Sequence, residues 1–173
     1  MSNKFLFITL SVVAIGTIGF VMLNNSKIPD KPRLGTAQTD QGRTHIKAGE
    51  KITYKSAIPT SGPHGQEAPW GYSATQYANE NVIHNMEHGG IVVSYRPDLD
   101  VATINKIKAL YTSPFSTTNF QPNKVVIMPR AGQQKPIVLA SWNRLLELDS
   151  YNQQTLIDYY LTNVGKSPEP TAT

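Results

Sequence analysis

The most apolar part of the chain is the run from Phe5 to Leu23, which contains no charged residue. At about 1.5 Å per residue, a helix of this length measures roughly 28 Å, close to the hydrocarbon thickness of a bilayer. A cleaved signal peptide is the alternative, but its apolar region is usually about 7–15 residues long. The pattern therefore predicts one N-terminal transmembrane helix, an anchor over residues 1–25.

Beyond this run the composition changes twice more. Residues 26–43 contain several prolines and glycines and few apolar residues, which is typical of a flexible tether that cannot bury a core. Residues 44–164 have the length and the mixed polar and apolar pattern of one folded domain. Residues 165–173 contain two prolines, and we expect a disordered tail there.

Short alternating or β-branched runs predict the strands of this domain. Lys51–Ser56 alternates between polar and apolar residues, and Ile91–Tyr95 is a β-rich run. Between them, residues 57–81 are rich in Pro, Gly, Ser and Asn, and a long irregular stretch inside a compact domain is usually functional. Two further strands are predicted over Lys124–Met128 and Pro136–Trp142.

Helical signals occur in three places. Residues 81–88 predict two helical turns that stop at a pair of glycines. A longer helix capped by Asp98 or Asp100, and a last helix capped by Asp149 or Ser150, show apolar residues at helical spacing. Together the elements predict an α+β fold: a small, largely antiparallel sheet with two helices on one face, preceded by one transmembrane helix.

The chain carries a formal net charge of +4 and has a pI near 9.3, but its lysines and arginines are scattered. Nucleic-acid binding needs clustered cations, so we expect no nucleic-acid partner. Lys27, Lys31 and Arg33 follow the apolar run and suit contact with anionic lipid headgroups, which makes the lipid bilayer the expected partner of residues 5–23. The positive-inside rule taken alone would place the C-terminal domain in the cytoplasm, so charge leaves the orientation open.

Histidine is rare in this chain and concentrated in two motifs. His84 and His88 are four residues apart, which places both imidazoles on one face of a helix. His64 follows a stiff Ser-Gly-Pro turn, and His45 lies further upstream. Imidazole is the commonest ligand for borderline transition metals, and a facial set of three with an open position suits Zn(II) or Cu(II). The alternative is a helix-capping histidine beside one that packs in the core.

Two neighbouring residues bear on the chemistry of this motif. Met86 lies between the two histidines and would point away from them on a helix, so core packing is favoured over a copper(I) thioether ligand. With Glu87 the string matches the inverted zinc-peptidase pattern, but that pattern needs a helix that continues past the motif, and Gly89–Gly90 argues against it. Glu87 is therefore expected to orient an imidazole or to form a surface ion pair.

Several stretches also resemble a bacterial domain-of-unknown-function family, number 3105. The similarity covers about residues 41–169, and its most specific parts are the motifs Pro59–His64 and His84–Gly90; the others are Gln41–His45, Tyr95-x-Pro97, Ala140–Trp142 and Pro168–Glu169. The resemblance implies a short protein with one N-terminal span and an extracytoplasmic domain. It also implies that all four histidines fall on family motifs, while Met86 stands where leucine is expected. It implies no activity.

The resulting hypothesis is an inner-membrane, single-pass protein whose extracytoplasmic, periplasmic domain holds or transfers one copper or zinc ion. His64, His84 and His88 are the expected ligands, with His45 as a fourth, and their nitrogens should lie about 3–4 Å apart. One alternative is a metal-dependent enzyme at the same site, although no catalytic set is recognisable. The other is an accessory subunit of a larger membrane protein complex, with structural histidines.

Overall fold

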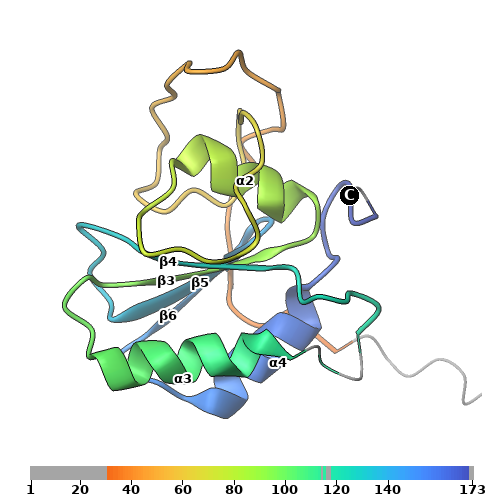
Figure 1. Cartoon of the computed structure of the whole chain (residues 1–173). Helices are drawn as coiled ribbons and strands as arrows, with labels where there is room; N and C mark the ends of the chain where they lie inside the picture. The colour runs from red at the N-terminus through yellow and green to blue at the C-terminus, as the bar shows by residue number, and fades with distance from the viewer. Residues whose placement is uncertain (1–30, 114, 116–117, 172–173) are drawn as a thin grey trace, which may run out of the picture. The chain divides into compact units, whose positions relative to one another are not determined.

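The computed structural model describes residues 31–113, 115 and 118–171 (Figure 1). The predicted transmembrane helix, the start of the predicted tether and the last two residues lie outside the described residues, so the anchor stays a prediction. In the described part of the chain, none of the helices has the length and apolar character needed to cross a bilayer. From Arg33 onward the described residues form one folded unit.

The fold is α+β, and its described residues form a six-stranded sheet and three helices. The strands are β1 (Thr36–Ala37), β2 (Gly71–Tyr72), β3 (Ile91–Tyr95), β4 (Val125–Pro129), β5 (Ile137–Ser141) and β6 (Arg144–Leu148). The helices are α2 (Asn79–Glu87), α3 (Val101–Thr112) and α4 (Gln153–Asn163). The short helix and the strands predicted around β3, β4 and β5 are thus present, whereas the sequence pattern predicts neither β1, β2 nor β6.

The sheet is mixed rather than largely antiparallel. Its strand order is β1-β6-β5-β3-β4-β2, with antiparallel pairing from β1 to β3 and parallel pairing between β3 and β4 and between β4 and β2. The parallel pair β3–β4 is connected through α3, because parallel neighbours need a long crossover, usually a helix. Central strand β3 therefore has a parallel partner on one side and an antiparallel partner on the other.

Both faces of the sheet are covered, which explains the apolar character of its central strands. In β3, Ile91, Val93 and Tyr95 belong to the core cluster that includes residues of α3 and α4, whereas Val92 belongs to the cluster that includes residues of α2. Figure 1 shows α3 and α4 on one side of the sheet and α2 on the other. The two expected helices share one face, and α2 covers the opposite face.

The predicted strand over Lys51–Ser56 is wrong. The backbone N–H of Ile52 donates to the carboxylate of Glu80, 3.1 Å away, instead of to a neighbouring strand. The ring of Tyr54 packs against the core cluster beneath α2, and its hydroxyl donates to the carbonyl of Pro63. The alternating pattern here reflects a loop that packs on the domain through every second side chain.

The folded unit extends beyond the predicted bounds 44–164 at both ends. Arg33 donates to the side chain of Asn163 at 3.0 Å and to the carbonyl of Trp142 at 2.6 Å, and β1 pairs with β6. At the other end, the N–H of Gly165 donates to the carbonyl of Gly89, and that of Glu169 to the carbonyl of Glu87. Residues 33–43 are therefore not a free tether, and residues 165–170 are not a loose tail.

The ends of α2 and α3 show how local sequence positions these elements. Asp100 caps α3 by accepting from the N–H of Thr103, which confirms one of the two predicted caps. After α2 the chain turns at Gly89, whose φ is +84°, a conformation that favours glycine. A Cβ on the next residue, Gly90, would lie 2.7 Å from the carbonyl oxygen of Asn85, so only glycine fits there.

Replacing Gly90 by alanine is expected to destabilise the domain by about 1–3 kcal/mol. The added methyl meets a backbone oxygen of α2 that cannot move without distorting the end of the helix. Gly65→Ala is the matched control, because its Cβ would meet only Ile46, at 3.9 Å, and we expect a change within about 0.5 kcal/mol. Urea unfolding measures both, and equal losses would contradict the packing argument.

Candidate metal centre

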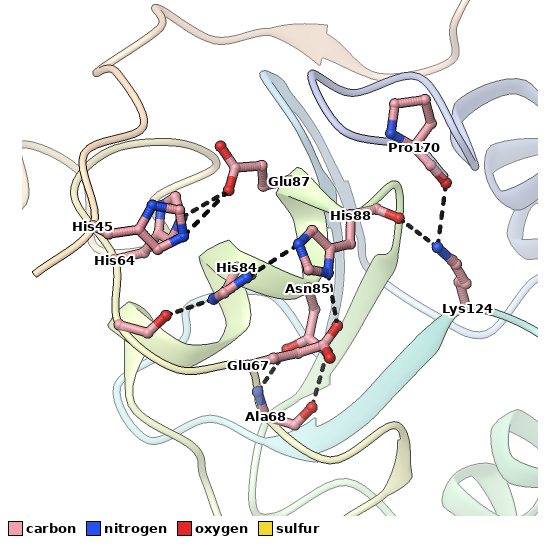
Figure 2. A network of polar contacts seen from close by, with 11 residues as sticks. His45, His64, Glu67, Ala68, His84, Asn85, Glu87, His88, Lys124 and Pro170 are labelled. Atoms are coloured by element: carbon pink, nitrogen blue, oxygen red, sulfur yellow. Dashed lines mark hydrogen bonds and ion pairs between the residues drawn. The ribbon is translucent and has the colours of Figure 1, made fainter. Parts of the chain in front are cut away.

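The four histidines come from three segments that the fold brings together (Figure 2). His84 lies in the last turn of α2 and His88 is the C-cap residue directly after it, so they are one turn apart. His64 lies on the irregular segment before α2. His45 lies beside it, because the N–H of His64 donates to Thr44 and the N–H of Ile46 donates back to His64, each at 2.9 Å.

Backbone carbonyls hold the Nδ1 nitrogens of two of the histidines. Nδ1 of His64 lies 2.9 Å from the carbonyl oxygen of Gly62, and Nδ1 of His84 lies 2.6 Å from that of Gly65. A carbonyl oxygen can only accept, so both Nδ1 atoms carry protons. Nδ1 of His88 lies 3.4 Å from a carboxylate oxygen of Glu67. The rings of His64 and His84 therefore present Nε2 to the rest of the cluster, the usual arrangement of metal-bound imidazoles.

The Nε2 atoms of His84 and His88 lie 3.1 Å apart. Two ligands at 2.0–2.1 Å from a tetrahedral ion lie about 3.3 Å apart, so this pair is spaced to share one ion. Burial, and then the charge of the neighbouring His84, lowers the pKa of His88. The ring of His88 is therefore neutral down to a lower pH than a free imidazole, which keeps it available as a ligand.

Glu87 is completely buried, and its carboxylate points toward His64 and His45 (Figure 2). One of its carboxylate oxygens, Oε2, lies 2.9 Å from Nε2 of His64 and 3.9 Å from Nε2 of His45. Its other oxygen, Oε1, accepts no hydrogen bond from any described residue. Because both nitrogens of His64 face acceptors, a proton or another cation must lie between its Nε2 and Glu87.

Two overlapping groups of side chains have ligand atoms within 4.8 Å of one another. The first is His45, His64 and His84, and the second is His84, Glu87 and His88. All four histidines expected as ligands are thus brought into one cluster, but not as one triad of His64, His84 and His88. His84 is common to both groups, and the carboxylate of Glu87 is itself a possible ligand rather than only an orienting group.

Sequence reasoning misses the residues that hold the cluster in place. Glu67, three residues after His64, contacts His88, and no motif marks it. Asn85 is buried, and its side chain donates to the carbonyl of Ala68 and accepts from the N–H of Ala68. This pair of hydrogen bonds fixes the segment that carries Glu67 against α2. The sequence signals this role only through the position of Asn85, an amide residue between two histidines on a predicted helix next to a long loop.

The family described as Protein of unknown function (DUF3105) matches residues 45–173. The chain belongs to this family. The match covers all four histidines of the cluster and confirms the resemblance of the two histidine motifs to the DUF3105 family. No curated protein and no solved structure matches the chain. The site of this DUF3105 domain is therefore interpreted from its own geometry.

Replacing Asn85 by alanine is expected to destabilise the domain by about 2–4 kcal/mol, because both backbone groups of Ala68 lose their partner in a buried position. Asn81→Ala is the matched control: the same residue type on the same helix, with a solvent-accessible hydrogen bond to the carbonyl of Gln66. We expect a cost below about 1 kcal/mol for this control. Thermal and urea unfolding measure both variants. A loss at Asn85 no larger than that at Asn81 would contradict the proposed fixing role.

Proposed function

We propose that this domain binds one divalent transition-metal ion, copper or zinc, and holds it or hands it on to a partner. The observation that carries the proposal is the direction of the imidazole rings. Carbonyl acceptors at Nδ1 turn the Nε2 atoms of His64 and His84 toward the interior of the cluster, where Nε2 of His88 lies 3.1 Å from that of His84. Lone pairs of histidine and glutamate side chains converge here, and there are too few protons to form hydrogen bonds between all of them. Such an arrangement is a cation site.

A purely structural role explains this arrangement less well. Nδ1 of His88 is buried and makes no hydrogen bond with any described residue, while its Nε2 lies 3.1 Å from Nε2 of His84. The buried oxygen Oε1 of Glu87 likewise lacks a donor among the described residues. Buried polar groups are normally hydrogen-bonded, so two such deficits at one place favour a bound ion.

The donor set favours copper(II) or zinc(II) over other ions. Imidazole nitrogens and one carboxylate suit these borderline ions, whereas magnesium and calcium take oxygen ligands. The chain has no cysteine, and Met86 is buried in the core cluster between α2 and the sheet, so Met86 adds no soft sulfur ligand to the set. Core packing of Met86 agrees with its expected role.

For the location of the site, the proposal relies on the sequence. The apolar run Phe5–Leu23 would anchor the chain in the inner membrane through one span, with the domain on the extracytoplasmic side. A domain tethered there is well placed to take up an ion and pass it to a membrane complex. The lipid bilayer, and such a complex, are the partners that this proposal implies.

A metal-dependent hydrolase is the second candidate, and one observation favours it. Two histidines and one glutamate, as in the group His84, Glu87 and His88, are a ligand set of catalytic zinc sites. In the inverted zinc-peptidase pattern Glu87 would instead be a general base on a continuing helix, but α2 ends at Glu87 itself. Peptidase activity that disappears in Glu87→Gln while zinc stays bound would favour this candidate over metal storage or transfer.

The direct test loads the purified full-length protein with Cu(II) or Zn(II), removes loose ions by desalting and counts the metal by mass spectrometry. We expect about one ion per chain in the wild type and less than about a tenth in His84→Ala, since His84 belongs to both groups. Asn81→Ala, one turn earlier on α2, should keep the wild-type content.

Circular dichroism must show that His84→Ala is folded for the comparison to count. Two results would overturn the proposal: a wild type that retains less than about a tenth of an ion, or a folded His84→Ala with unchanged content. Loss of stability in the histidine variants, with no difference in metal content, would instead favour the accessory subunit with structural histidines.

A further inference from the structure

The two groups of ligands differ in their access to solvent. In the first group the side chain of His45 is 58% exposed, while that of His64 is fully buried. In the second group Glu87 is fully buried and the side chain of His88 is only 11% exposed. The groups therefore define an outer position with three imidazoles and an inner position with two imidazoles and a carboxylate, joined by His84.

The C-terminal segment binds the backbone at the end of α2, beside the inner position. The N–H of Glu169 donates to the carbonyl of Glu87, and that of Gly165 to the carbonyl of Gly89. Lys124 donates to the carbonyls of both His88 and Pro170, which holds this segment beside the end of α2 (Figure 2). A hydrated ion from solvent consequently meets His45 before it can reach His88.

His84 can serve only one of these positions at a time. Its Nδ1–H donates to the carbonyl of Gly65 at 2.6 Å, so a single lone pair remains, on Nε2. An ion at the outer position and an ion at the inner position would compete for this lone pair. For two ions to bind at once, one of the two positions would need another ligand in place of His84.

We propose that a single ion occupies the two positions in turn, entering through His45 and moving inward around His84. This rests on the proposed function and specifies how the site is filled. During the move the ion exchanges His45 and His64 for Glu87 and His88, while the bond to His84 is kept. The exchange is a change of ligands at constant oxidation state, so no electron acceptor or donor is required.

Glu87 is placed to assist this exchange. Its Oε2 contacts His64 of the outer position, and its buried Oε1 has no donor among the described residues. A carboxylate that reaches both positions can bind the ion as His64 releases it. The negative charge also makes the buried inner position favourable for a divalent ion, because paired charges can be buried where isolated ones cannot.

The test measures zinc uptake and release by the full-length protein, with stopped-flow mixing against a zinc-sensitive dye and a strong chelator. His45→Ala removes the outer position only and should slow uptake at least about tenfold, with about one ion still bound. Lys47→Ala is its control, an exposed cation two residues along the same segment, and should leave uptake unchanged. His88→Ala removes the inner position only and should speed release at least about tenfold at an unchanged uptake rate.

Glu87→Gln provides a second probe of the inner position with the shape of the side chain kept, and it should also speed release. Two ions per wild-type chain would overturn the shared-ligand proposal, as would equal effects of His45→Ala and His88→Ala on both rates. Either result leaves metal binding itself intact. A wild type that binds no ion would instead refute the proposed function, and this inference with it.

Discussion

The site depends on one constraint, the fixed direction of imidazole rings inside the protein. A histidine ring has two nitrogens, and whatever holds one of them decides what the other can do. Here backbone carbonyls of Gly62 and Gly65 accept from the Nδ1–H groups of His64 and His84. Both carbonyls belong to the irregular segment before α2, so the course of this segment determines which way the lone pairs point. If this segment moved, the rings of His64 and His84 would turn and the four histidines would no longer converge.

The rest of the fold holds this segment in place against α2. Helix α2 packs on one face of the sheet through Val82, Ile83 and Met86, and the buried amide of Asn85 clamps the segment to the helix. The glycine pair after His88 turns the chain directly into the central strand β3. The last histidine of the cluster is therefore only three residues from a strand that is buried throughout, which gives the site a rigid base. Helices α3 and α4 support that strand from the opposite face.

Local patterns predict what depends on local sequence. The sequence correctly predicts the histidine spacing on α2, the cap at Asp100 and the apolar strands β3, β4 and β5. In each case the burial or hydrogen bonding of a few neighbouring residues determines the pattern. The pattern fails where distant partners decide the structure. Lys51–Ser56 alternates like a strand, yet the N–H of Ile52 bonds to a side chain of α2. The parallel pairing of β3 with β4 follows from the α3 crossover and not from either strand alone.

The same limit applies to the site. Sequence motifs identify the four histidines, but the division into two groups around His84 depends on how three segments meet. The roles of Glu67 and of the two glycine carbonyls follow from tertiary contacts with no motif of their own. Membership of the DUF3105 family confirms the motifs without adding a chemical role, so the geometry alone connects these residues to metal binding.

The most direct measurement of the central claim is long-range ¹⁵N–¹H NMR of the histidine side chains in ¹⁵N-labelled full-length protein, before and after Zn(II) is added. We expect His64 and His84 to carry their proton on Nδ1 throughout, and the Nε2 resonances of the cluster to shift when zinc binds. Protons on Nε2 of His64 and His84 in the zinc-loaded protein, with Nε2 signals unchanged by zinc, would contradict it.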